Sequence, residues 1–295
     1  MKSMLNGWIS IIKEKNFTSN FYINFLKKIL KKNKLGHAGT LDPFAEGVLP
    51  IAIGEATKSV SFFQTSTKIY YFEMIWGEET DTLDCDGVVV KKKKFFPKKI
   101  DLINVLKKFS GYILQLPPKF SANKINGVRA YTLARKNIDF SLTQKKVLIK
   151  KIRLISHENN KSCFLVKCGS GTYVRSLARD IANELGGAVY VNKLLRRRTG
   201  CFSIKNSMSL SIINKDPKLT TISKYLLDIS NVLIHIPSVN LNEEKVSLIR
   251  KGLKINLTDK FGNQSLDRIF TKISKKPVAL GYLKEGFFYP KRVFN

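Results

Sequence analysis

Hydrophobic and polar residues recur along the chain with two periods, one typical of helices and one typical of strands. Apolar residues spaced three or four apart between lysines predict an amphipathic helix that begins after Thr18 or Ser19; they are Tyr22, Phe25, Leu26, Ile29 and Leu30. Residues 48–60 and 68–77 are short runs rich in β-branched and aromatic side chains, and both predict strands.

The middle of the chain alternates between helical and irregular patterns. Residues 101–113 predict a short helix, and Pro117-Pro118 excludes regular structure at the start of a segment that ends in another helix near residue 135. Residues 162–187 predict a strand, a glycine turn and a helix, with Thr172 as N-cap and Gly186 as the stop.

Arg175 falls in the first turn of that helix, where the helix dipole already carries partial positive charge. Its side chain either extends to solvent or is placed to meet an anion, and the position alone favours neither alternative.

The irregular order of helices and hairpin-like strand pairs favours a mixed α+β fold over a doubly wound sheet. Pro237 marks a boundary, because it is followed by a short helix (243–251) and by a hairpin around residues 284–286. We therefore expect a large domain over residues 1–236 and a small β-rich domain over 237–295.

The charge narrows the class of partner. The chain has 295 residues and a formal net charge of +30, from 52 Lys and Arg against 22 Asp and Glu. A polyanion, above all nucleic acid, relieves such self-repulsion. Lysine is frequent throughout, including the loop KKKKFFPKK (91–99), so that loop is either an RNA contact or a composition bias.

Membrane, secretory and disulfide classes are not indicated. No apolar run is long enough to suggest a membrane span, and the first residues lack the features of a secretory signal. The four cysteines form no C-x-x-C pair and the three histidines are far apart, so we expect reduced thiols, no zinc site and a cytoplasmic protein.

The stretch GHAGTLDPFAEGVLP (36–50) places Asp42 directly before a proline. A carboxylate there is either a turn former or a reactive group, and only His37 and Glu46 lie close enough in sequence to join it at a metal. DTLDCDG (81–87) fails as a calcium loop, because Thr82 and Lys93 occupy carboxylate positions, so we interpret it as an acidic turn.

Taken whole, the motif GHAGTLDPFAEGVLPIAIGEATK resembles the signature of the TruB-type tRNA pseudouridine synthases, the bacterial pseudouridine-55 family. The resemblance continues through KIYYFEMIWGEETDTLDCDG, QLPPKFSANKINGVRAYTLAR, GSGTYVRSLARDIANELG and the closing PKRVFN. It implies a pseudouridine synthase fold, with a mainly antiparallel mixed sheet and surrounding helices, followed by a PUA-like RNA-binding β domain.

The resemblance also implies a role for three catalytic residues. Asp42 falls on the essential aspartate, which attacks the target uridine or its ribose, or removes a sugar proton. Tyr70 falls on the tyrosine that stacks on the target base and assists proton removal at C5. Arg175 falls on the arginine that pairs with the aspartate.

Substrate-binding residues follow from the same comparison of motifs. Leu194 falls on a leucine that packs against the flipped base, and His37 on a histidine that contacts the nucleotides displaced around the target. Lys13 and Lys124 match basic positions that contact RNA or hold the fold.

Two motifs depart from the family pattern. IKEKNFTS (12–19) keeps Lys13 but lacks the usual proline and glycine, and VYVNKLLRRR (189–198) has Tyr190 and Leu195 at a His and an Arg position. The basic stretch 196–198 is a candidate to contact phosphates instead.

The resemblance implies an isomerase that converts uridine 55 in the tRNA T-arm to pseudouridine by flipping the base, with no metal and no small-molecule cofactor. We expect a monomer. Three alternatives stay open, namely a non-catalytic tRNA-binding or tRNA-folding protein, a guide-RNA-dependent relative, and, least favoured, a metal-dependent hydrolase built on DTLDCDG.

Overall fold

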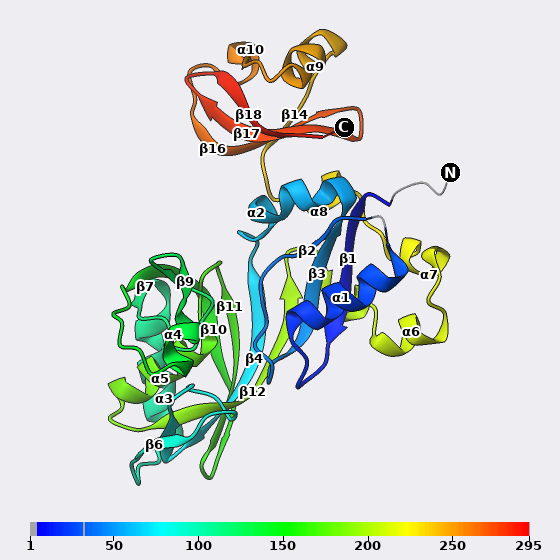
Figure 1. Cartoon of the computed structure of the whole chain (residues 1–295). Coiled ribbons are helices and arrows are strands. Elements are labelled where there is room, and N and C mark those ends of the chain that lie inside the picture. Colours follow the sequence, from blue (N-terminus) through cyan, green and yellow to red (C-terminus); the bar gives the residue numbers. More distant parts are fainter. Residues whose placement is uncertain (1–4, 32, 295) are drawn as a thin grey trace.

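A computed structural model describes residues 5–31 and 33–294 of the chain. It contains a nine-stranded sheet, a five-stranded sheet and two small two-stranded sheets. Figure 1 shows the five-stranded sheet with its two helices standing above the rest of the molecule. No helix in the described ranges is long and apolar enough to cross a membrane.

The nine-stranded sheet forms the body of the molecule. Along it the strands follow the order β1-β3-β12-β4-β11-β10-β7, with β2 paired to β3 and β13 paired to β12. Only the β3–β12 pairing is parallel among these described pairs. The strands are β1 (Gly7–Lys13), β2 (Leu35–His37), β3 (Glu46–Ile53), β4 (Lys68–Trp76), β7 (Gly111–Gln115), β10 (Lys145–Glu158), β11 (Lys161–Cys168), β12 (Val189–Thr199) and β13 (Phe202–Ser203).

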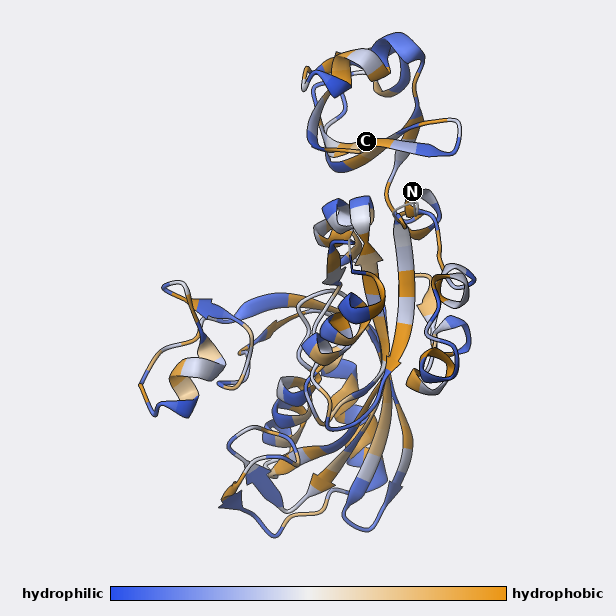
Figure 2. Ribbon diagram, turned by 45° about the vertical axis from the view of Figure 1, so that its right-hand side comes forward, coloured by the Kyte–Doolittle hydropathy of each residue, from blue (hydrophilic) through white to orange (hydrophobic). Residues whose placement is uncertain are grey.

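Helices cover this sheet in separate groups, because each buries an apolar stripe against the strands. One apolar cluster joins α5 and α3 to β4, β11 and β12, and a second joins α1, α6 and α7 to β1 and β3. In Figure 2 the central strands carry most of the hydrophobic colour. The helices are α1 (Ser19–Ile29), α2 (Val60–Phe63), α3 (Lys99–Val105), α4 (Ala130–Arg135), α5 (Val174–Glu184), α6 (Leu210–Lys215), α7 (Leu219–Ser223) and α8 (Ile229–Val232), with 3-10 turns at Gly54–Ser59, Leu106–Phe109 and Ile204–Asn206.

Two small hairpins project from the body. One consists of β5 (Glu78–Thr80) and β6 (Val89–Lys92), and the other of β8 (Lys124–Ile125) and β9 (Val128–Arg129).

The five-stranded sheet has the order β14-β16-β17-β18-β15 and its own apolar core. Its elements are β14 (Ser238–Asn240), α9 (Glu243–Arg250), β15 (Ile255–Asn256), α10 (Thr258–Phe261), β16 (Leu266–Ile273), β17 (Lys276–Lys284) and β18 (Phe287–Val293). Phe270, Leu280 and Phe294 pack in one cluster with Trp8 and Phe63, so the five-stranded sheet rests directly on the body.

Several predicted elements are confirmed. The helix after Thr18 exists, and the Thr18 hydroxyl caps it by accepting from the Phe21 N–H. The mixed α+β architecture, the acidic turn at 81–87 and the helix that ends near residue 135 are also present.

Other predictions are wrong in detail. Residues 54–59 form a 3-10 helix and not a strand, because Thr57 and Ser59 each donate a hydroxyl to the carbonyl three residues earlier. Residues 111–113 belong to β7, which pairs with β10, and not to a helix. The strand β1 has no counterpart among the elements expected from the sequence.

Candidate active site

The loop between β2 and β3 presents Asp42 at the rim of a cavity. Its backbone carbonyl accepts from the Ala45 N–H, so the residue does form a turn, yet its side chain is 36% exposed. Lys13 stabilises the turn, because its Nζ donates to the carbonyls of Pro43 (3.0 Å) and Ala45 (2.5 Å).

Lys13 itself is completely buried at the end of β1. Burial lowers its pKa to about 8, against the opposing pull of Asp42 and Glu46. Lys13 was expected either to contact RNA or to hold the fold, and its buried position fits the second role. The prediction that Lys13 binds substrate needs correction, because no part of the side chain reaches the surface.

Arg175 meets Asp42 from the first turn of α5. Its guanidinium lies 2.9 Å from Asp42 Oδ2 and 3.0 Å from Asp84 Oδ2, and its side chain is only 4% exposed. Two further N–H groups donate to the carbonyls of Thr82 and Phe120. The side chain therefore does not extend to solvent, and its position near the helix N-terminus is explained by two anionic partners.

Asp84, the second partner, lies in the acidic turn 81–87 and was not predicted as a site residue. Its Oδ1 accepts from the Thr82 hydroxyl at 2.7 Å and from the Asp86 N–H at 3.1 Å. Burial raises its pKa above the usual range, and Arg175 opposes that rise. The only sequence signal was the acidic motif itself, since its partner is about ninety residues away in the chain.

Helix α5 begins one residue later than predicted. Thr172 donates its hydroxyl to the Gly169 carbonyl, and the Tyr173 N–H is capped by the side chain of buried Gln115 at 2.8 Å. At the other end Gly186 has a φ of +76°, and hydrogen bonds from Gly186 to Asn183 and from Gly187 to Ala182 close the helix as predicted. The N-terminal end of α5 places Arg175 in the first turn of the helix.

A cavity of about 390 Å³ brings four predicted residues together. Asp42, Tyr70, Arg175 and Leu194 all line it, along with Tyr173 and the glycine turn 169–171. Tyr70 on β4 is 8% exposed, and burial raises the pKa of its hydroxyl. The volume is in the range of pockets that hold small organic ligands.

Two cations at the cavity were not predicted for it. Lys68 is buried, and burial lowers its pKa to about 8. Arg196 is also buried and donates to the carbonyls of Val48 and Gly39, so it holds the Asp42 loop against β12. Contact of the stretch 196–198 with phosphates stays a prediction. Arg197 and Arg198 are exposed.

His37 and Lys124 do not line this cavity. His37 is half-buried in β2, burial lowers its pKa, and its Nδ1 is buried without a hydrogen-bond partner in the described parts of the chain. Lys124 is exposed in the β8–β9 hairpin. A larger cavity of about 680 Å³, lined by residues from 79–90 and 116–142 together with Arg179, contains none of the predicted site residues.

A metal centre is not apparent at either cavity. Across residues 5–31 and 33–294, no three His, Cys, Asp or Glu side chains are grouped closely enough to hold a metal ion. The acidic residue Asp84 is instead engaged by Arg175.

Comparison with known proteins places this geometry in a family. Residues 27–174 match the model of the TruB family pseudouridylate synthase N-terminal domain. The chain is 39% identical to "tRNA pseudouridine synthase B" of Ehrlichia chaffeensis, over 98% of this chain and 99% of the relative. It is 35% identical to the protein of that name from Sinorhizobium medicae, over 98% and 96%.

The solved structures agree on the fold. A chain in the crystal structure of a Cbf5-Nop10-Gar1 complex aligns with a TM-score of 0.75 and 24% identity, covering 98% of this chain and 85% of that one. At this identity the likeness speaks for the fold alone. Together with the curated relatives, the family match shows that this chain is a member of the TruB family of pseudouridylate synthases.

Proposed function

We propose that the protein converts uridine to pseudouridine in tRNA, at position 55 of the T-arm, with Asp42, Tyr70 and Arg175 as its catalytic residues. The observation that carries the proposal is the Asp42 carboxylate at the cavity rim, with one oxygen held by Arg175. The curated relatives bear the name of this tRNA enzyme, and the charge of +30 suits an RNA substrate.

The reaction breaks the N1–C1′ bond of uridine and forms a C5–C1′ bond, while C5 loses a proton and N1 gains one. Atoms and electrons balance within the nucleotide. The target base must leave its RNA stack, which costs on the order of a few kcal/mol, and contacts in a pocket offset this cost. Tyr70 and Leu194 both line the cavity in which a flipped uracil would stack and turn.

Asp42 is suited to act on the sugar or the base because its carboxylate lies at the cavity and is oriented by the Arg175 guanidinium. Oδ2 is paired with the guanidinium, and Oδ1 is the oxygen outside that ion pair. Attack on the uridine, attack on the ribose, and removal of a sugar proton are all compatible with a carboxylate at this point.

We propose RNA-binding roles for the C-terminal residues and for two side chains outside the cavity. We propose that the small domain, from about residue 237 to 295, grips tRNA away from the target loop. Lys124, in the exposed β8–β9 hairpin, is proposed to contact phosphate, and His37 to meet nucleotides displaced around the target. The protein is proposed to act as a monomer in the cytoplasm.

The test is tritium release from tRNA that carries 5-³H-uridine, with wild type, Asp42→Asn and Asp86→Asn compared. Asp86 is an exposed carboxylate in the acidic turn and serves as the matched control. We expect release by wild type and by Asp86→Asn, none by Asp42→Asn, and none when the T-arm uridine is replaced.

Two outcomes would contradict the proposal. Release by Asp42→Asn at the wild-type rate would remove Asp42 from the chemistry. Tight tRNA binding without any release by wild type would favour a non-catalytic tRNA-binding protein or a protein that needs a guide RNA.

A further inference from the structure

Five side chains on the small domain form a continuous stack of rings and cations. The rings of Tyr282 and Tyr289 are parallel within 5°, with centroids 5.0 Å apart. Lys291 Nζ lies 4.9 Å from the Tyr282 ring, and Lys254 Nζ lies 5.0 Å from the Phe287 ring and 5.8 Å from the Tyr289 ring. We call Tyr282, Phe287, Tyr289, Lys254 and Lys291 the aromatic ledge.

The ledge continues the side of the sheet that rests on the body of the molecule. Leu280 and Tyr282 are two residues apart on β17 and therefore point to the same side. Leu280 is fully buried against the body, whereas Tyr282 and Tyr289 are half-buried and their lysines are exposed. The ledge thus begins where the contact between the domains ends.

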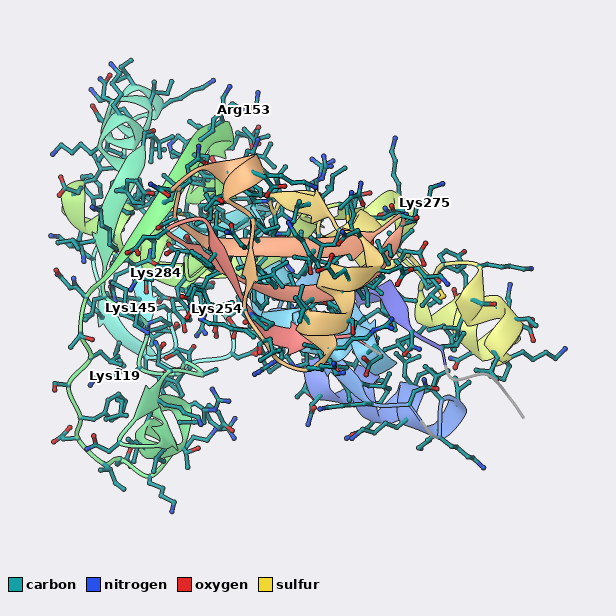
Figure 3. The ribbon with its side chains drawn as sticks, turned by 90° about the horizontal axis from the view of Figure 1, so that it is seen from above. Lys119, Lys145, Arg153, Lys254, Lys275 and Lys284 are labelled. Atoms are coloured by element: carbon teal, nitrogen blue, oxygen red, sulfur yellow. The ribbon has the colours of Figure 1, made fainter. Side chains whose placement is uncertain are left out.

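Figure 3 shows on which side of the molecule Lys254 of the ledge lies. Lys254 and Lys284 stand at the end of the sheet nearer to Lys119 and Lys145 of the body, and Lys275 stands at the opposite end. Lys119 and Lys145 flank the segment that carries the β8–β9 hairpin and Phe120, whose carbonyl accepts from Arg175. Lys254 of the ledge therefore lies on the same side of the molecule as Lys119 and Lys145 of the body.

We propose that the aromatic ledge binds unpaired nucleotides of the substrate RNA that lie outside the stem-loop holding the target uridine; this inference rests on the proposed function. Bases stack on aromatic rings regardless of sequence, and lysines beside the rings meet the phosphates of the same strand. The exposed lysine over each ring can turn to a phosphate while a base takes its place. A duplex keeps its base faces inside the helix, so half-exposed rings favour a single strand over a duplex.

The first experiment removes the rings. Tyr282→Ala/Tyr289→Ala is compared with Tyr112→Ala, which removes an exposed tyrosine ring on β7 that has Lys146 Nζ 4.8 Å away. We expect the double variant to bind full-length tRNA about tenfold more weakly or worse, and to bind and modify an isolated T-arm hairpin as wild type does. Tyr112→Ala should match wild type on both RNAs.

The second experiment changes charge and leaves the rings in place. Lys254→Ala/Lys291→Ala should reduce the slope of log K against log salt by about 0.7 for each lysine, as expected for contacts to single-stranded phosphate. A short unstructured oligouridine should compete with tRNA for wild type more strongly than for the tyrosine variant, whereas a blunt RNA duplex should show no such difference.

RNA binding by the ledge is excluded if the tyrosine variant binds tRNA as tightly as wild type while wild type modifies tRNA normally. It is equally excluded if the lysine variant keeps the wild-type salt slope, or if the tyrosine variant loses affinity for hairpin and full-length tRNA in the same proportion. Failure of the proposed function is recognised separately, since wild type itself would then release no tritium.

Discussion

At the residue scale, the molecule is organised around one guanidinium shared by two carboxylates. Arg175 is nearly buried, and a buried cation without partners would be strongly unfavourable. Asp84 is the buried partner and Asp42 the partly exposed one, so Asp84 keeps Arg175 in place while Asp42 remains accessible from the cavity.

These separate roles of Asp84 and Asp42 predict the effect of Asp84→Asn. The variant removes the counter-charge that fixes Arg175, which can then shift relative to Asp42. We expect the turnover rate to fall by at least about tenfold and the free energy of unfolding to fall by about 1–3 kcal/mol. Single-turnover pseudouridine formation and urea denaturation measure the two effects.

Asp86→Asn is the control for this prediction, since it changes an exposed carboxylate two residues further along. An Asp84→Asn variant as active as Asp86→Asn would show that Asp42 and Arg175 keep their geometry without the second carboxylate.

The lowered pKa of Lys13 gives a pH dependence with a defined sign. In the folded chain the lysine releases its proton at a pH of about 8, whereas in the unfolded chain it does so near 10.5. Between these values the unfolded state binds more protons, so the free energy of unfolding rises with pH. Relative to Lys13→Met, the wild type should gain stability from pH 8 to 10.5, as followed by urea denaturation; a constant difference over that range would contradict the burial of its charge.

The sequence alone could identify part of this site. Asp42, Tyr70, Arg175 and Leu194 were predicted from motifs, and the structure places all four at one cavity. Asp84 and Arg196 were missed as site residues because their roles arise from contacts to Arg175 and to the Val48 and Gly39 carbonyls, all distant in sequence. Lys13 was identified as a basic motif residue, but the sequence does not show that the Asp42 loop covers it.

At the element scale, the parallel pairing of β3 with β12 brings the Asp42 loop onto the sheet. Gly47 makes this approach possible. Its φ is +107°, and a Cβ atom there would stand 2.3 Å from the Arg196 carbonyl oxygen. A side chain at this position cannot be accommodated unless the two strands separate.

Gly47→Ala should therefore destabilise the protein by about 3 kcal/mol or more, since it combines backbone strain with a backbone clash. Gly111→Ala is the matched control, because Gly111 has a φ of +84° and no atom within 4 Å of the added Cβ, which leaves only about 1–2 kcal/mol of strain. Thermal unfolding of both variants provides the comparison; equal losses would show that the β3–β12 contact yields easily.

Local pattern predicted some elements and missed others for a physical reason. Helix α1 has its apolar stripe and its Thr18 cap within one short segment, so the sequence contains the whole signal. Strands β1 and β7 depend on partners that are 30 or more residues away in the chain, β3 and β10. Gly111 is a local signal that ends the preceding helix, with a φ of +84°, and the prediction did not use it. Only the pairing with β10 makes residues 111–113 a strand.

At the scale of the whole molecule, the five-stranded sheet and the body share an apolar contact. Leu280 of β17 is fully buried in the cluster that includes Phe270, Trp8 and Phe63, and Lys58 adds a hydrogen bond to the Val293 carbonyl. We expect burial of these side chains to couple the folding of residues 237–295 to that of the rest of the chain.

Leu280→Asp should uncouple the domains, because it places a charge in this apolar contact. We expect calorimetry to resolve two unfolding transitions where wild type shows one, and tRNA binding to weaken. Leu253→Asp, which alters a half-exposed leucine on the same domain, should leave the single transition intact. One transition in both variants would mean that the contact does not couple the domains.

The cluster of Arg175, Asp42 and Asp84 also bears on how this protein can evolve. Replacing a buried ion pair with well-packed apolar side chains is often neutral, or stabilises a protein by about 1–4 kcal/mol. Substitutions that make this part of the chain fold more tightly are therefore readily available, and each would abolish the proposed reaction. At these positions selection for folding and selection for catalysis act in opposite directions, so persistence of the charged cluster in a lineage records that the activity is still required.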